Sequence, residues 1–224
     1  MEKVVAFDLD GTLSESDLFL IPSYKAALCE RGLPMLSDER LKLLIGCTIE
    51  NARAIVMPDR PMEEYLEYSR AVGRHVQDFV RRGRPYPGIP ESLAKLRTRG
   101  YKVALCSNGE SHYVYQVLDS LGLTQYFDFV QHVVLGCDKS DLLRRVIEKF
   151  APAKVVMVGD RVYDVEAARN NAVPVIGCLY GLYPVSYTHL DVYKRQVLAL
   201  RFCSLPGPSG GGVCRRAGKK RPQS

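Results

Sequence analysis

The sequence predicts an α/β fold, an open parallel sheet covered by helices with a helical domain inserted after its first strand. Short apolar runs alternate with helical patterns from residue 90 to residue 176, which is typical of parallel βαβ units. The apolar run Val4–Phe7 provides one further strand, and no strand pattern interrupts residues 17–83. We therefore expect an α/β core of residues 1–16 and 84–184 with a helical cap of residues 17–83.

The composition fits a protein with one sizeable core. The chain has 224 residues, of which 46% are hydrophobic. No apolar run reaches the length of a membrane span, and residues 1–15 lack the basic start and long apolar stretch of a signal peptide. Seven cysteines without Cys-x-x-Cys spacing favour reduced thiols over disulfides or a zinc site. We expect a cytoplasmic protein with no membrane partner. The sequence does not predict the oligomeric state.

The positive net charge lies at the C-terminal end of the chain. Residues 185–224 hold eight of the 31 Lys and Arg residues and one of the 25 acidic residues. Their net charge is +7, whereas that of the whole chain is +6. Residues 1–184 retain 23 basic and 24 acidic residues, a net charge of −1. A basic tail that binds nucleic acid is one interpretation of this distribution, but the rest of the chain predicts no nucleic-acid partner.

The segment 185–196, Val-Ser-Tyr-Thr-His-Leu-Asp-Val-Tyr-Lys-Arg-Gln, resembles a translated sequencing adapter. The residues from Pro206 to Ser224 are rich in Gly, Pro, Ser and basic side chains without apolar periodicity. We therefore expect residues 185–224 to be a non-native, mobile tail. On this hypothesis the tail does not rebuild the edge of the sheet beside the strand Val173–Ile176.

The inserted region contains four helical patterns in succession. The first has apolar residues at helical spacing and ends at Gly32, and the second begins at Ser37 and runs to Gly46. Thr48 is placed to cap a third helix, and Met62–Val80 forms a long fourth. The turn-rich residues 81–88 then lead back to the core.

The remaining core elements alternate regularly. The expected helices are 90–99, 111–121, 140–150 and 162–170, and the expected strands are 101–106, 127–130, 155–158 and 173–176. Because consecutive parallel strands need crossover connections, this order places every strand end at one edge of the sheet. In such sheets this edge carries the ligand site.

The first strand delivers two carboxylates to that edge. Asp8 and Asp10 are followed by Gly11 and Thr12, and alternate residues of an extended strand share a face. Two carboxylates this close raise each other's pKa, and a divalent cation bound between them would remove that cost and hold phosphate oxygens. The alternative is a strand followed by a simple Asp-Gly turn.

Three later strand ends add polar groups. Ser107, Asn108 and Gly109 place a hydroxyl and backbone donors before a helix, which suits a phosphate, although a simple helix N-cap explains them equally well. Lys139 opens a helix, a poor place for a cation unless it faces an anion. Asp160 follows an apolar strand, and Asp164 lies one helical turn further on, facing the same edge as Asp160.

These four motifs in this order, with the helical insertion after the first, resemble the haloacid dehalogenase superfamily and its phosphoglycolate phosphatase-like branch with a helical cap. The resemblance covers residues 3–184 and implies a Rossmann-like core and a magnesium-dependent phosphatase of small phosphorylated metabolites. It implies that Asp8 is the nucleophile that forms an aspartyl-phosphate and Asp10 the general acid and base. Further implied roles are catalytic for Ser107 and Lys139, substrate-binding for Thr12, Asn108 and Gly109, Mg²⁺-binding for Asp8, Asp10 and Asp160, and orienting for Asp164.

Other activities share this scaffold. The second acid, Asp10, argues against a dehalogenase, but a sugar-phosphate mutase of the same fold has every core motif. A non-catalytic module that binds a phosphorylated ligand is the alternative outside enzymes. The resemblance leaves the substrate open, because it implies that residues of the cap select it; Tyr24, Thr48, Glu50 and the arginines are candidates.

Overall fold

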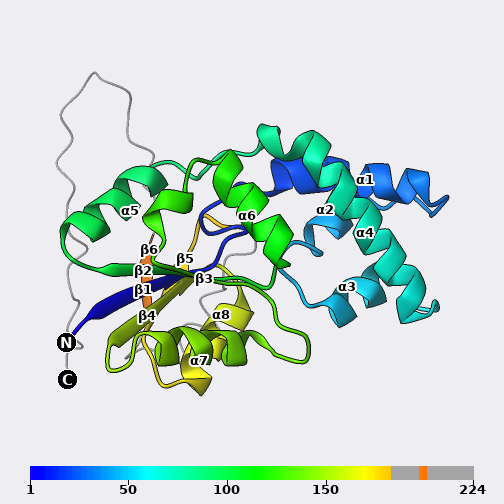
Figure 1. Cartoon of the computed structure of the whole chain (residues 1–224). Coiled ribbons are helices and arrows are strands. Elements are labelled where there is room, and N and C mark those ends of the chain that lie inside the picture. Colours follow the sequence, from blue (N-terminus) through cyan, green and yellow to red (C-terminus); the bar gives the residue numbers. More distant parts are fainter. Residues whose placement is uncertain (183–196, 201–224) are drawn as a thin grey trace, which may run out of the picture.

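The computed structural model describes residues 1–182 and 197–200, which form an α/β sheet with a helical cap at one end (Figure 1). The six strands are all parallel and lie in the order β3-β2-β1-β4-β5-β6. Their bounds are β1 Lys3–Phe7, β2 Lys102–Cys106, β3 Phe129–Gln131, β4 Lys154–Gly159, β5 Val175–Cys178 and β6 Val197–Leu200. The predicted fold class is confirmed.

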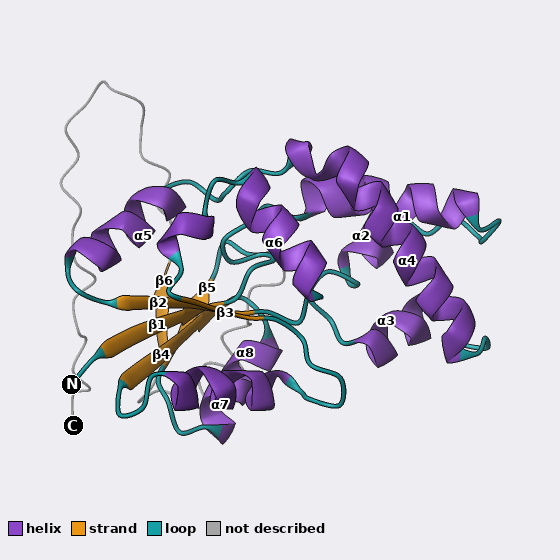
Figure 2. Cartoon of the chain, viewed as in Figure 1, coloured by secondary structure: helices purple, strands orange, loops and turns teal. Residues whose placement is uncertain are grey.

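Helices cover both faces of the sheet (Figure 2). One face is covered by α5 (Ile89–Thr98) and α6 (Ser111–Ser120), and the other by α7 (Lys139–Lys149) and α8 (Val162–Asn170). Two short 3₁₀ turns, η1 (Val80–Arg82) and η2 (Thr124–Tyr126), complete the connections. The predicted core helices are therefore all present, with ends within one residue of those expected.

The first strand lies at the centre of the sheet, between β2 and β4. Its side chains alternate between two apolar clusters, with Val5 and Phe7 on the face of α5 and α6, and Val4 and Ala6 on the face of α7 and α8. A strand buried on both faces needs a continuous apolar run, which is why this segment carries none of the usual polar alternation.

The cap consists of α1 (Asp17–Glu30), α2 (Asp38–Lys42), α3 (Ile49–Val56) and α4 (Met62–Phe79). The expected N-caps are confirmed, since the hydroxyls of Ser37 and Thr48 accept hydrogen bonds from Arg40 N and Asn51 N. The expected second helix was wrong in length: α2 ends at Lys42 and not at Gly46. Residues 43–46 instead make successive turns that end at Gly46 with a φ of 72°.

Two linkers join the cap to the core, and they lie side by side. Glu15 N donates to Arg84 O at 3.0 Å, and the Arg84 guanidinium makes two 3.0 Å hydrogen bonds to the Glu15 carboxylate. Tyr86 N also donates to Leu13 O at 3.0 Å. The chain therefore enters and leaves the cap through one narrow, paired connection.

The C-terminal edge of the sheet corrects one expectation. Val197–Leu200 pairs in parallel with β5, so β5 is not an uncovered edge and part of the tail does form an element. The physical reason is that Val-Leu-Ala-Leu is a short apolar run of the kind that adds to an unpaired strand. The rest of the predicted mobile tail lies outside the described residues.

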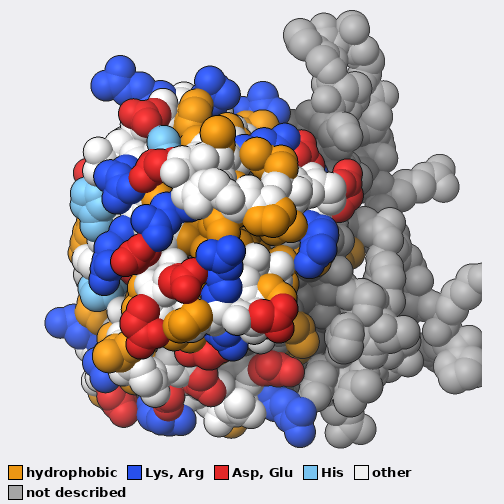
Figure 3. All heavy atoms as spheres, turned by 90° about the vertical axis from the view of Figure 1, so that its right-hand side faces the viewer, with side chains coloured by type: hydrophobic (Ala, Val, Ile, Leu, Met, Phe, Trp, Pro, Cys, Tyr) orange, Lys and Arg blue, Asp and Glu red, His pale blue; other side chains and the backbone are white. Residues whose placement is uncertain are grey.

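The outer surface of the cap mixes charges of both signs (Figure 3). Several of these charges form exposed ion pairs between helices, such as Arg31 with Glu67 and Arg74 with Glu30. The basic side chains in the described part of this face are thus interspersed with acidic and apolar ones. Among the described helices, none combines the length and apolar character needed to cross a membrane.

Candidate active site

The site begins at Asp8, the first residue after β1. Its N–H donates to Val158 O at 2.8 Å, so pairing with β4 continues one residue beyond the strand and fixes the position of Asp8. The Asp8 carboxylate is buried and accepts a 2.5 Å hydrogen bond from Lys139 Nζ. Lys139, at the start of α7, thus faces an anion.

Lys139 also contacts a second carboxylate, since its Nζ lies 3.2 Å from Asp164 Oδ1. Burial alone would lower the pKa of the Lys139 ammonium, but the carboxylates of Asp164 and Asp8 outweigh burial and raise it. Burial raises the pKa of Asp164 to about 6 against the opposing effect of Lys139. At neutral pH one cation therefore balances part of the charge of two buried carboxylates.

The carboxylates of Asp8, Asp160 and Asp164 converge, with one ligand atom from each lying within 4.8 Å of the others. Asp164 is committed to Lys139 and to the N–H of Arg161, which donates to Asp164 Oδ2 at 3.1 Å. Asp8, which also pairs with Lys139, thus forms with Asp160 and Asp164 a buried acidic cluster whose carboxylate oxygens are of the kind that holds a divalent cation.

Glycines allow this close approach. Gly11 has a φ of +85°, and a Cβ at this residue would lie 2.4 Å from Asp160 Oδ2. A Cβ at Gly181 would lie 2.3 Å from the Asp160 Cβ. Thr12 Oγ1 donates to Asp160 Oδ1 at 3.1 Å, so the residues around Asp160 fix it tightly.

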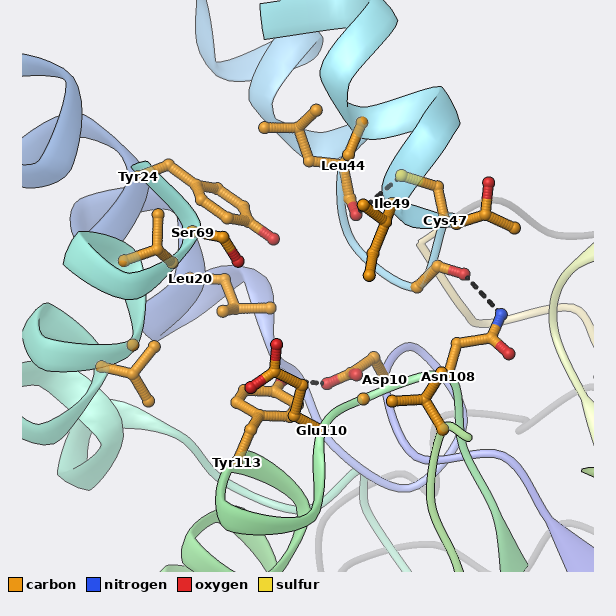
Figure 4. Close-up of a pocket in the computed structure, with 18 of the residues that line it drawn as sticks. Asp10, Leu20, Tyr24, Leu44, Cys47, Ile49, Ser69, Asn108, Glu110 and Tyr113 are labelled. Atoms are coloured by element: carbon orange, nitrogen blue, oxygen red, sulfur yellow. Dashed lines mark hydrogen bonds between the residues drawn. The ribbon is translucent and has the colours of Figure 1, made fainter. Parts of the chain in front are cut away.

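The Asp10 side chain lies apart from the three convergent carboxylates and takes different partners. Its Oδ1 accepts hydrogen bonds of 2.5 Å from Ser16 Oγ and from Tyr113 OH. Figure 4 shows Asp10 and Tyr113. Burial raises the pKa of Asp10 from 3.8 to about 6, and the charge of Asp8 acts in the same direction, while the hydrogen bonds from Ser16 and Tyr113 oppose it. A carboxyl group of this pKa can both donate and accept a proton near neutral pH.

The loop after β2 brings backbone donors to the same edge. Ser107 is buried, and its Oγ accepts a 3.0 Å hydrogen bond from Gly109 N. The simple N-cap interpretation does not hold, because the N-cap of α6 is Glu110. Asn108 Nδ2 instead donates to Gly46 O of the cap at 3.3 Å. Asn108 and Gly109 therefore line the pocket between the core and the cap, whereas Ser107 is buried and is not part of that lining.

The sequence model of the haloacid dehalogenase-like hydrolases matches residues 5–178, which includes every motif described above. The chain belongs to this family. A phosphoglycolate phosphatase from Agrobacterium fabrum is 30% identical over 206 residues, covering 85% of this chain and 86% of the relative. A second, from Aquifex aeolicus, is 29% identical over 184 residues, covering 80% of this chain and 85% of the relative.

The fold is also similar to that of a solved structure from this family. A haloacid dehalogenase-like hydrolase from Streptococcus pneumoniae superposes with a TM-score of 0.76 at 18% identity, covering 89% of this chain and 94% of the other. Together with the family match and the phosphatase relatives, this identifies the chain as a haloacid dehalogenase-type phosphatase.

Some residues of this family site could not be found from the sequence. Tyr113 and Ser16 hold Asp10, yet in the sequence one is part of an amphipathic helix and the other of a polar linker. The Arg161 guanidinium donates to Ile45 O in the cap, and Asn51 Nδ2 donates to Tyr163 OH at 2.9 Å. These contacts across the cap–core boundary depend on how the two parts meet, for which no local pattern gives a signal.

Proposed function

We propose that this phosphatase hydrolyses small phosphate monoesters with magnesium, through an aspartyl-phosphate on Asp8. The observation that carries the proposal is the division of the buried carboxylates into two environments. Asp8, Asp160 and Asp164 converge, with Lys139 paired to the first and the last of them, whereas Asp10 accepts hydrogen bonds from two hydroxyl groups. Different environments suit different roles, a nucleophile in one and a proton carrier in the other.

In the first step an Asp8 oxygen attacks phosphorus, and the bond from phosphorus to the ester oxygen breaks. Asp10 gives its proton to that oxygen, so the product leaves as a neutral alcohol. Lys139 holds Asp8 in place and balances the growing charge beside it. In this proposal Ser107 and the backbone donors near Asn108 and Gly109 bind the phosphoryl oxygens.

In the second step Asp10, now a carboxylate, takes a proton from water while the water oxygen attacks phosphorus. The bond from phosphorus to the Asp8 oxygen breaks, which releases phosphate and restores both carboxyl groups. The cap contacts Asn108–Gly46 and Asn51–Tyr163 support a site that is shielded from bulk water during both steps.

The donor set fits magnesium, because Asp8 and Asp160 supply hard carboxylate oxygens and Thr12 steadies Asp160. The backbone carbonyl of Asp10 is the third protein ligand that we propose. Bound magnesium would neutralise charge on the transferring phosphoryl group. The role of Asp164 in this scheme is to orient Lys139 and not to bind the metal.

The test is phosphate release from 4-nitrophenyl phosphate with magnesium, with excess chelator, and with the variant Asp160→Asn. We expect turnover only in the first case, and the exposed Asp59→Asn provides a control that keeps activity. Full turnover in chelator would contradict the metal requirement. For the intermediate, acid-quenched protein that has met a radiolabelled substrate should carry label that hydroxylamine removes, and Asp8→Asn should carry none.

A further inference from the structure

A cavity of about 180 Å³ lies between the cap and the core, directly beside Asp10. Its core side is formed by Asp10, Asn108 and Gly109 and by α6, and its other walls by the cap (Figure 4). In the proposed reaction Asp10 protonates the ester oxygen, so the organic group of the substrate extends from Asp10 into this space. The lining of the cavity therefore selects that group.

The walls of the cavity are largely apolar and aromatic. Cap residues contribute most of this surface, among them Leu20, Tyr24, Leu44, Ile49, Tyr65 and Val72. Two of the candidates from the sequence, Tyr24 and Thr48, are part of the lining, whereas Glu50 lies on the exposed side of α3. The arginines between residues 81 and 84 are not part of it.

The charges in the lining are all negative. Asp10 and Glu110 are acidic, and none of the described residues that line the cavity is Lys, Arg or His. Figure 4 shows both carboxylates on the core side, with the hydroxyl of Tyr24 directed into the space opposite them. Asp10 carries a proton when the ester binds and Glu110 is exposed, so the main cost to a second anionic group on the substrate is the loss of its water in a lining that offers no counter-ion.

One residue in the lining, Tyr68, has a buried hydroxyl group. The Tyr68 side chain is 1% exposed, and its hydroxyl has no hydrogen-bond partner among the described residues. Buried hydroxyl groups are normally satisfied, and a ligand atom in the cavity would supply the hydrogen bond that the Tyr68 hydroxyl lacks among the described residues. Burial raises the pKa of Tyr68, and the group therefore meets that ligand atom as a neutral hydroxyl.

We infer that the cavity selects phosphate esters of uncharged, largely apolar alcohols that carry a neutral hydrogen-bonding group, and disfavours esters with a second anionic group. This inference rests on the proposed function and specifies its substrate class. Phosphoglycolate, the substrate in the names of the two relatives above, has a carboxylate on its organic part and falls in the disfavoured class.

Three esters of nearly equal size test this inference: benzyl phosphate, 4-carbamoylbenzyl phosphate and 4-carboxybenzyl phosphate. We expect kcat/KM for the neutral amide to be at least about tenfold above that for the carboxylate. Phosphoglycolate should be as poor a substrate as the carboxylate ester. Equal or higher kcat/KM for either carboxylated ester would overturn the inference while leaving the proposed hydrolysis intact.

Two pairs of variants identify the groups responsible. Glu110→Gln should lower the ratio of kcat/KM for the amide ester to kcat/KM for the carboxylate ester. Glu166→Gln, on the exposed side of α8, should leave this ratio unchanged. Tyr68→Phe should lower kcat/KM for the amide more than for benzyl phosphate, and Tyr115→Phe, at an exposed position, should not. An unchanged ratio in both Glu110→Gln and Tyr68→Phe would overturn the assignment of the cavity.

If no ester is hydrolysed, measurements of ligand binding distinguish failure of the proposed hydrolysis from failure of the inference about the substrate class. Absence of phosphate release from every ester would remove the proposed function. Calorimetry with the corresponding benzylphosphonates would then still decide the inference, since the neutral compound must bind at least about tenfold more tightly than the carboxylated one. Equal binding would refute the selection of uncharged groups.

Discussion

Replacing Asp10 with Asn removes a charge whose burial destabilises the folded protein at neutral pH. Folding raises the Asp10 pKa from 3.8 to about 6, chiefly through burial. In the range between these values the folded protein binds more protons at this carboxyl group than the unfolded chain does. The contribution of Asp10 to stability is therefore complete below the unfolded pKa of 3.8 and is lost as pH rises through about 6.

The size of the effect follows from the shift of about two pKa units, which corresponds to about 3 kcal/mol at pH values above 6. Asn keeps an oxygen that can accept the hydrogen bonds of Ser16 and Tyr113. The variant therefore avoids the cost of the buried charge without emptying the site. The same change removes proton transfer and should lower kcat by roughly 10²–10⁴-fold.

Guanidinium denaturation in chelator, at about pH 4 and about pH 8, measures the free energy of unfolding of both proteins. The stability gained by Asp10→Asn should be about 3 kcal/mol larger at the higher pH. Comparing the two pH values cancels any cost of Asn that does not depend on pH. Asp59→Asn, at an exposed position, should show no such pH-dependent gain. A gain that is equal at both pH values would refute burial of the Asp10 charge as its cause.

Three further outcomes are expected. Lys139→Met leaves two buried carboxylates without their cation and should lower the free energy of unfolding by about 3–5 kcal/mol, measured by denaturation at neutral pH. Gly11→Ala should abolish phosphate release because the added Cβ collides with Asp160. Its control is Gly122→Ala, because Gly122 also has a positive φ, +64°, but no atom lies within 4 Å of the added Cβ. This control should keep activity and lose only about 1–2 kcal/mol of stability. Tyr113→Phe removes a hydrogen bond that lowers the Asp10 pKa, so the alkaline limb of the pH–rate profile should move to higher pH; movement to lower pH would contradict the assignment of Asp10.

Most core elements could be predicted from the sequence because each apolar run has the length of one strand. The last predicted strand began too early, at Val173, for a local reason. Val173 N donates to Ala168 O at 3.0 Å and closes α8, and Pro174 has no N–H to contribute to the sheet. Pairing with β4 therefore begins at Val175. An apolar run shared between a helix end and a strand start cannot be divided by hydrophobicity alone.

The carboxylates of the site were predictable for a different reason. Parallel strands bring their carboxyl ends to one edge, so Asp8 and Asp160 had to meet there whatever the details of the loops. Tyr113 was not predictable, because its hydroxyl reaches Asp10 from a helix distant in sequence. The Arg161 contact with Ile45 likewise requires the cap in its final position.

The central position of β1 has a consequence for the order in which the chain folds during synthesis. The strand leaves the ribosome before both of its neighbours, β2, which begins at Lys102, and β4, which ends at Gly159. Helices α1 and α4, which contact each other in the cap, both precede these neighbours in the sequence. We therefore expect the cap to fold early as a local unit while the apolar segment Val4–Phe7 stays exposed. The residues that deliver the nucleophile are thus the ones that most need protection from aggregation in the nascent chain.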